Sequence, residues 1–324
     1  MSASSGRCAV VRAALLPAGS DPFTLAYWLR NYATWSQYVD ELHITISGAI
    51  EPEPYAYIEA AVAAAPNATL YNMGRGRTVH GEMLTVLLSK TKADHILLCE
   101  DDAYIRRPEI IDECFRFAEE GGIVATPRGG YASHEVVNAA FWAFGDDISF
   151  WPCFVFAPRE ALEATDHNFG TKVWEPGDVL LDHTIEETCG ADTFVWATYQ
   201  LRSQGRDERL LDNVRLSGQN VPDDAPWFHV GSLSGGHGLA FMGNIDDIRY
   251  RFEVDGFQRL PAGNAWQRFG WWERMWRVAE GSIPEYRERY HAEMTRFRDD
   301  VGITANDVEA YQPIADHLVT WAER

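Results

Sequence analysis

Three consecutive carboxylates, Glu100, Asp101 and Asp102, follow an apolar run that ends at Cys99. Four apolar residues in succession are typical of a strand buried on both faces of a parallel sheet. The acids would then lie at the carboxyl end of that strand, where open α/β sheets bind ligands. Because like charges this close repel one another, a cation among them is the simplest remedy. Carboxylate oxygens are hard ligands, so the triplet predicts a site for Mg²⁺ or Mn²⁺.

The residues of the triplet leave two interpretations open. In an extended segment side chains alternate, so Glu100 and Asp102 point to one side and Asp101 to the other. The first and third acids are then placed to share a cation. A solvated turn after the strand fits the same residues, because Asp is a common turn residue.

Strand-like and helix-like segments alternate ahead of the triplet. Apolar runs predict strands, and capping residues before apolar positions at helical spacing predict helices. The predicted strands are 9–16, 42–46, 69–71 and 96–99, and the predicted helices begin at Asp21, Pro54 and Thr78. This alternation predicts an α/β fold with a mostly parallel, Rossmann-like sheet flanked by helices and right-handed crossovers.

The chain beyond the triplet predicts more elements of the same kind. Further helices are expected from Pro108 to Gly121, after Pro158 and over 193–204, and further strands over 123–125, 152–157, 209–216 and 226–230. The stretch 126–149 lacks a regular pattern, and long irregular segments within a domain are usually functional. From about Asp246 onward the composition changes to charged and aromatic helices, which predicts a helical C-terminal extension.

Composition and charge narrow the classes of function. The 324 residues include 28 basic and 48 acidic ones, so the net charge of −20 argues against nucleic acid or an anionic membrane as a partner. No apolar stretch approaches the roughly 20 residues of a membrane span. The N-terminus lacks a signal-peptide layout, and we expect a cytoplasmic protein. Five scattered cysteines without a CxxC pair predict reduced, mostly buried thiols.

These features together resemble the GT-A glycosyltransferases, most closely the broad family 2 type. The resemblance covers roughly 9–236 and is carried by the alternating units, the acidic triplet and an acid that opens a later helix. It implies a nucleotide-sugar-binding and catalytic domain over 1–245, with the helical extension over 246–324. It also implies a nucleotide-sugar donor, most often a UDP-sugar, and Mn²⁺ or Mg²⁺ held by an Asp-x-Asp motif.

The triplet is similar to that motif. By the resemblance Asp102 binds the metal, Glu100 faces the ribose or a metal-bound water, and Asp101 belongs to the donor site. Glutamate in the first place departs from the motif and leaves the ribose contact open. The stretch 47–51 also differs from the Asp-rich turn that family members carry after the second strand, so no base-recognition residue is assigned.

The resemblance also implies a general base for the acceptor hydroxyl. Asp192 is similar to the acid that opens the acceptor-side helix and acts as base in inverting members, and Glu187 and Glu186 are substitutes. A carboxylate near the hydroxyl is suited to that role. The alternative is that Asp192 is an ordinary N-cap before Thr193, for which Asp is among the best residues.

A histidine after the last core strand is a further metal ligand in several such enzymes, and His229 stands at that place. Imidazole beside carboxylates suits Mn²⁺. The loop 231–236 that follows includes Ser232, and its backbone amides would approach phosphate oxygens. His237 is a second candidate ligand, and a structural histidine is the alternative for both.

Basic and aromatic residues complete the candidate site. Arg75, Arg77 and His80 occupy the place of a loop that lies beside the nucleotide in related enzymes, and arginine matches a diphosphate well. A solvated loop is the alternative. Among the aromatic residues, Trp142, Phe144 and Trp151 are suited to stack on a sugar or acceptor, with core packing as the alternative.

We therefore expect a metal-dependent glycosyltransferase that moves a sugar from a nucleotide donor to an unidentified acceptor hydroxyl, with inversion. One alternative is a phage-type enzyme that glucosylates a hydroxymethylated base in DNA, which the net charge disfavours. Another is a nucleotidyltransferase, although the stretch 16–21 lacks the glycine-rich, basic loop that this class carries after its first strand. A non-catalytic binding module is the remaining alternative.

Overall fold

A computed structural model of the chain gives the arrangement of the following residues. It describes 6–14, 35–47, 63, 67–72, 80–100, 103–129, 143–146, 148–167, 169–170, 172–191, 193–212, 222 and 224–229. The helical extension predicted for 246–324, the boundary near 245 and the helices predicted from Asp21 and Pro54 lie outside the described residues.

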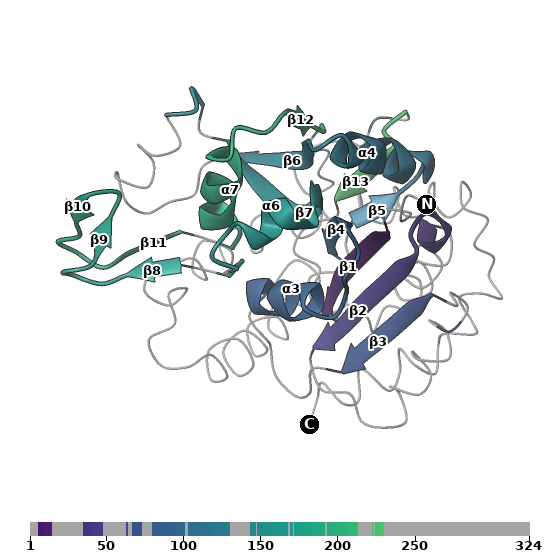
Figure 1. Cartoon of the computed structure of the whole chain (residues 1–324), viewed down its shortest axis with the longest axis horizontal. Coiled ribbons are helices and arrows are strands. Elements are labelled where there is room, and N and C mark those ends of the chain that lie inside the picture. The colour runs from purple at the N-terminus through teal and green to yellow at the C-terminus, as the bar shows by residue number, and fades with distance from the viewer. Residues whose placement is uncertain are drawn as a thin grey trace, which may run out of the picture.

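A seven-stranded sheet forms the centre of the described chain, in the order β12-β6-β7-β4-β1-β2-β3 (Figure 1). Its strands are β1 (Arg7–Ala14), β2 (Glu41–Ser47), β3 (Ala68–Asn72), β4 (His95–Glu100), β6 (Ile123–Gly129), β7 (Ile148–Pro158) and β12 (Glu208–Leu210). β7 runs antiparallel to its neighbours β4 and β6, and the other neighbouring pairs are parallel. The predicted α/β class with a mostly parallel sheet is confirmed.

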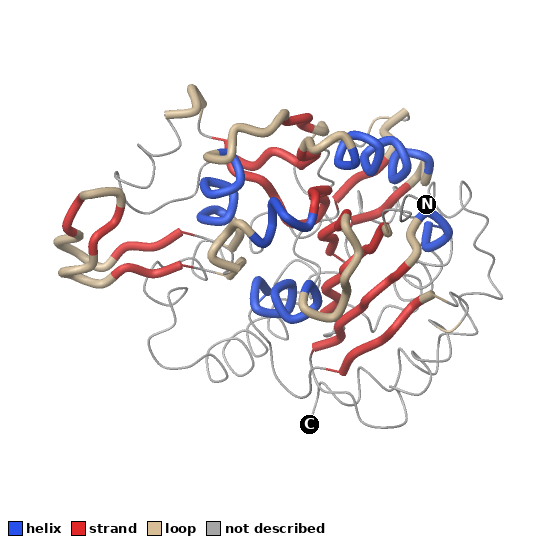
Figure 2. Tube along the Cα trace, in the orientation of Figure 1, coloured by secondary structure: helices blue, strands red, loops and turns tan. Residues whose placement is uncertain are grey.

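The apolar run in β4 shows why this strand is central. Leu97 and Cys99 face a core that includes α4 (Glu109–Glu119), whereas Ile96 and Leu98 face a core that includes α3 (His80–Leu88). All four side chains are buried. The second core also takes residues from α6 (Arg159–Glu163) and α7 (Val195–Arg202), so helices cover both faces of the sheet (Figure 2).

Two smaller structures flank the sheet. β5 (Ala103–Ile105) pairs antiparallel with β13 (Trp227–His229) close to the carboxyl end of β4. An arm of short strands projects from the body on the side of α7 (Figure 1). It comprises β8 (Lys172–Trp174), β9 (Val179–Leu180), β10 (His183–Thr184) and β11 (Cys189–Ala191). The arm has its own small core around Trp174 and Leu180, and the sequence pattern did not predict it.

Several boundaries differ from the predicted ones. β6 extends to Gly129 and β7 begins at Ile148, so both ends of the stretch predicted as irregular belong to strands. β12 ends at Leu210, well short of the predicted 216, while the residues from 213 to 216 lie outside the described chain. Helix α7 begins at Val195 with Phe194 as its N-cap, so the N-cap alternative for Asp192 is wrong.

All five cysteines are buried and none forms a disulfide, which agrees with the predicted reduced thiols. Among the described residues, no helix is long and apolar enough to cross a membrane.

Candidate metal and donor site

A buried ion pair lies at the carboxyl edge of the sheet. Glu100 is the last residue of β4, and its Oε2 is 3.4 Å from Nε2 of His229. The Glu100 side chain is 8% exposed and the His229 side chain 1% exposed. The structure thus brings together the predicted metal ligand His229 and the first acid of the triplet, which are far apart in the sequence.

The backbone register explains how His229 reaches this edge. In the β5–β13 pair, His229 is opposite Ala103, the residue that follows Asp102. Residues opposite each other in an antiparallel pair have Cα atoms about 4.5–5.5 Å apart. Short as it is, this two-stranded pair therefore fixes the backbone of His229 beside the end of the acidic triplet.

An aromatic residue and a cation border the ion pair. Trp151 meets the His229 ring edge to face, with centroids 4.7 Å apart, and the Arg128 guanidinium carbon lies 4.9 Å from the Trp151 centroid. The β6–β7 register shifts between Ala125 and Thr126, and Trp151 pairs with Thr126 just beyond the shift. Such irregularities re-aim side chains beside active sites. Trp151, predicted as a stacking platform, therefore lies at the candidate site.

The segment around Asp192 is anchored at both ends. Ala191 pairs with Lys172 in β8, and the Phe194 backbone N–H donates to the Phe169 carbonyl at 2.9 Å. Phe194 has a left-handed backbone, with φ of 66°, and this turns the chain into α7. The side chain of Asp192 itself lies outside the described residues.

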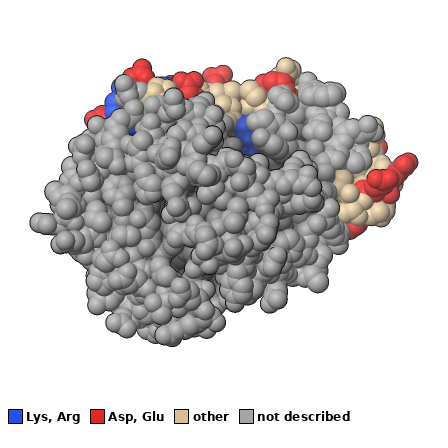
Figure 3. Space-filling model, turned by 180° about the vertical axis from the view of Figure 1, so that it is seen from behind, with Lys and Arg blue, Asp and Glu red and all other residues tan. Residues whose placement is uncertain are grey.

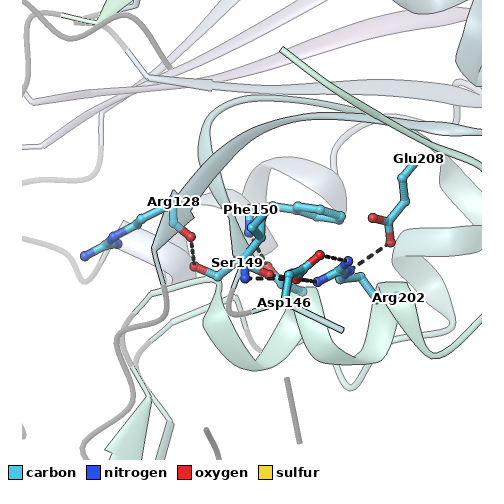
Figure 4. A network of polar contacts seen from close by, with 8 residues as sticks. Arg128, Asp146, Ser149, Phe150, Arg202 and Glu208 are labelled. Atoms are coloured by element: carbon cyan, nitrogen blue, oxygen red, sulfur yellow. Dashed lines mark hydrogen bonds and ion pairs between the residues drawn. The ribbon is translucent and has the colours of Figure 1, made fainter. Parts of the chain in front are cut away.

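Helix α7 is held against β7 by a polar network (Figure 4). The backbone N–H of Phe150 donates to the Thr198 hydroxyl at 2.9 Å. Two nitrogens of Arg202 donate to the two carboxylate oxygens of Asp146, just ahead of β7. This pair holds the pKa of Asp146 below its usual value, because the guanidinium favours the charged carboxylate. This bidentate pair of a buried arginine and a partly exposed aspartate thus fixes the chain at the edge that carries Glu100.

The other predicted residues are placed less fully. Glu187 and Glu186 are exposed in the connection between β10 and β11, on the projecting arm. His80 is the first residue of α3, and its side chain lies outside the description. Phe144 packs on Tyr199 and under Arg202. The remaining candidates also lie outside the described residues: Asp101, Asp102, Arg75, Arg77, Trp142, Ser232 and His237.

The described ligands fit a divalent cation. Two ligand atoms bound side by side to an octahedral ion lie about 3 Å apart, and the Glu100 and His229 atoms lie 3.4 Å apart. A buried carboxylate oxygen with an imidazole nitrogen is a suitable donor pair for Mn²⁺. Asp102 directly precedes Ala103, the residue in register with His229.

Arg128 is a site residue that the sequence did not indicate. It lies within the stretch predicted as irregular, in the part that continues β6, and no motif marks it. A signal was present in the alternation of β6, because Thr126 and Arg128 share one face of the strand and Trp151 is opposite Thr126. That signal depends on a register that the sequence does not reveal.

Comparisons with known proteins give structural similarity only. No protein-family model and no curated protein matches the chain. A solved structure from Desulfovibrio desulfuricans G20, described as a nucleotide-diphospho-sugar transferase, has a TM-score of 0.40 at 11% identity, covering 86% of this chain and 97% of that one. A Methanothermobacter nucleotidyl transferase has a TM-score of 0.38 at 11% identity, covering 64% and 88%.

A third similar structure is glucosyl-3-phosphoglycerate synthase from Mycobacterium tuberculosis, in complex with Mn²⁺, uridine diphosphate and phosphoglyceric acid. Its TM-score is 0.33 at 18% identity, and the match covers 50% of this chain and 58% of the synthase. The chain thus spans little more than half of that synthase's length.

Proposed function

We propose that the protein is a metal-dependent glycosyltransferase of the GT-A type that uses a nucleotide-sugar donor. The observation that carries the proposal is the buried Glu100–His229 pair, 3.4 Å apart at the carboxyl edge of β4 and next to two further acids in sequence. Open α/β sheets bind ligands at this edge. A buried histidine and carboxylate together with adjacent aspartates provide a cation site suited to a diphosphate.

Three residues hold the cation in this proposal: Asp102 and His229 as direct ligands, and Glu100 as ligand or as partner of a bound water. When bound, the ion supplies Lewis-acid stabilisation of the charge that develops on a leaving nucleoside diphosphate. Trp151 packs against the His229 ring and limits its rotation, because the two rings are in edge-to-face contact. The chain thus presents a fixed imidazole rather than a mobile one.

The diphosphate is held by cations and amides of the chain. Arg75 and Arg77 come between β3 and α3 in the sequence, His80 is the first residue of α3, and a guanidinium binds phosphate oxygens through its planar fork. We assign Ser232, three residues beyond the end of β13 in the sequence, to the same diphosphate. Arg128 stacks over Trp151 at the rim and adds positive charge at an otherwise acidic edge.

The acceptor hydroxyl loses its proton to a carboxylate of the chain, which we assign to Asp192. The anchored backbone on either side of it, from Ala191 to Phe194, supports this choice because a general base must be held within hydrogen-bond reach of its substrate. Such a base on the face opposite the leaving group gives inversion of the anomeric carbon. Glu187 is the second choice, and its exposed place on the arm makes it less suited.

A small or non-nucleic acceptor fits the charge of the chain better than DNA does. The net charge is −20, and acidic side chains are more prominent than basic ones on the described part visible in Figure 3. DNA binding relies on Lys and Arg contacts to phosphates. Five free, buried thiols are in keeping with a reducing compartment, and we propose the cytoplasm.

Release of nucleoside diphosphate from a donor panel tests this function. The protein is incubated with Mn²⁺ and UDP-, GDP- or TDP-sugars, with and without EDTA, and with His229→Gln and His183→Gln variants. His183 is an exposed histidine on β10 and serves as the matched control. We expect EDTA-sensitive release from one donor that only His229→Gln reduces. No response to any donor contradicts the proposal, and pyrophosphate release from a nucleoside triphosphate would indicate a nucleotidyltransferase.

A further inference from the structure

A second cluster of metal-ligating side chains lies at the amino edge of the sheet. The sulfur of Cys8, a carboxylate oxygen of Glu41 and a ring nitrogen of His43 all lie within 4.8 Å of one another. In the sheet register, Cys8 pairs with Ile96 and Arg12 with Glu100. Four residues of strand separate the two positions, or about 13 Å. The cluster is therefore separate from the candidate site at Glu100.

The strand register builds this cluster. Cys8 of β1 is directly opposite Glu41 of β2, and His43 follows Glu41 by two residues, so all three side chains point to the same face. That face carries α3, since Cys8 packs in the same core as Leu84 and Leu87. Two adjacent, hydrogen-bonded strands thus supply three ligands on a rigid frame.

The histidine is oriented as a metal ligand would be. Its Nε2 lies 3.0 Å from Oε2 of Glu41, and its Nδ1 lies 2.9 Å from the hydroxyl oxygen of Tyr71. Metal-binding histidines almost always have their other nitrogen hydrogen-bonded, and this fixes the ring. Tyr71 provides that second contact, leaving Nε2 directed toward the carboxylate and the thiol.

We propose that Cys8, Glu41 and His43 form a site for a borderline-soft divalent cation, with Zn²⁺ as the best fit. Sulfur, imidazole and carboxylate ligands together favour zinc over Mg²⁺ or Ca²⁺. A tetrahedral zinc ion places such ligand atoms about 3.3–3.6 Å apart, so small side-chain shifts close the site. Binding displaces the thiol proton to solvent, and the fourth position is left for water.

An entry path for the cation exists on one side of the cluster. The Glu41 side chain is 45% exposed, whereas His43 is 10% exposed and Cys8 is buried. A cation from solvent therefore meets the Glu41 carboxylate first and the two buried ligands next.

Cobalt titration of the full-length protein tests the site, because a thiolate bound to Co²⁺ gives a charge-transfer band in the near ultraviolet. Cys114→Ser is the matched control for Cys8→Ser, since both thiols are fully buried. We expect a band that saturates at one equivalent, is lost in Cys8→Ser and His43→Gln, and is kept in Cys114→Ser. Zn²⁺ should abolish the band and raise the Tm by on the order of 5 °C.

Two further variants keep the outcome decisive. Tyr71→Phe retains the aromatic packing and should weaken Co²⁺ binding about tenfold, as loss of an outer partner does. His229→Gln should keep the band, so a failure of the donor site and a failure of this site are distinguishable. Absence of a thiolate band in folded protein, or a band that persists in Cys8→Ser, overturns the proposal.

Discussion

The central sheet carries two histidine–glutamate pairs, one at its carboxyl edge, where the parallel strands end, and one at its amino edge, where they begin. At the carboxyl edge, His229 and Glu100 lie 3.4 Å apart with side chains 1% and 8% exposed. At the amino edge, His43 and Glu41 lie 3.0 Å apart with side chains 10% and 45% exposed. The two pairs thus make nearly the same contact, but the pair at the amino edge is more exposed to solvent than the pair at the carboxyl edge.

The neighbours decide what each pair does. His229 and Glu100 adjoin two more acids and are covered by Trp151, which gives an oxygen-rich, water-poor setting for a hard ion. His43 and Glu41 adjoin the Cys8 thiol and open to solvent through Glu41. A carboxylate as third ligand therefore favours Mn²⁺ at the proposed carboxyl-edge site, and a thiolate favours Zn²⁺ at the proposed amino-edge site.

Of the predicted effects, the loss of activity in Asp102→Asn should be the largest. Removing one charged ligand of the proposed cation should lower kcat about 10³-fold, because charge stabilisation of a leaving diphosphate is worth several kcal/mol. Asp207→Asn changes an exposed aspartate and should leave kcat unchanged. The thiolate–cobalt band of the amino edge should persist in both variants. Full activity of Asp102→Asn would remove the carboxyl edge from catalysis.

Two glycine-to-alanine substitutions test how tightly the chain packs at the two edges. A Cβ at Gly81, near the start of α3, would lie 2.0 Å from the backbone of Phe169 and Gly170, whereas a Cβ at Gly6, ahead of β1, would meet Ala93 at 3.6 Å. We expect Gly81→Ala to lower the free energy of unfolding by about 3 kcal/mol and Gly6→Ala by less than about 1 kcal/mol. Urea denaturation measures both. Equal losses would mean that α3 is free to move away from this contact.

Gly81→Ala should also affect activity more than its stability loss explains. Phe169 accepts the hydrogen bond from Phe194, which lies two residues beyond Asp192. A displaced Phe169 should therefore shift the proposed base.

Two arginine–aspartate pairs, one at each edge, should contribute the smallest of the predicted effects, which are on the free energy of unfolding. Arg202, 7% exposed, binds Asp146 bidentately, and Asp146 is 34% exposed, whereas Arg7 is 21% exposed and binds Asp112, which is 39% exposed. The arginines lower the pKa of both aspartates, so the stability they add is present above about pH 4 and is lost as the pH falls through the lowered pKa. After solvent screening, Asp146→Asn should cost about 1 kcal/mol at pH 7, because it loses two bonds to a buried guanidinium, and Asp112→Asn about 0.5 kcal/mol.

Chemical denaturation at pH 7 and pH 3 checks these two pairs. The difference between parent and Asp146→Asn should shrink at the lower pH, because pH 3 lies below the ordinary aspartate pKa and the unfolded chain is then mostly protonated. A difference that stays constant with pH would assign the effect to packing instead of charge.

Much of the sheet was predictable from local pattern. β1, β2, β3 and β4 fall within two residues of the predicted strands because each is a short apolar run. β7 was predicted as a strand but not as an antiparallel one, since its direction depends on pairing with β4 and β6 over long sequence distances. The arm from β8 to β11 was missed because its strands have only two or three residues each.

The residues of the candidate site likewise include some that the sequence could predict and some that depend on long-range pairing. Glu100 could be found from local chemistry, and His229 from the family resemblance, and the structure brings the two together. Trp151 was one of three aromatic candidates, and only the irregular β6–β7 register places it against His229. Arg128 could not be found, because its approach to Trp151 depends on that same register.

Electron–nuclear double resonance spectroscopy of bound Mn²⁺ tests the central claim most directly. The claim is that His229 and Glu100 hold a divalent cation at the carboxyl edge of β4. We predict that Mn²⁺ added with a nucleoside diphosphate shows hyperfine coupling to an imidazole nitrogen, and that His229→Gln loses this coupling while His183→Gln keeps it. Tight Mn²⁺ binding without nitrogen coupling, or with coupling that survives in His229→Gln, would contradict the claim.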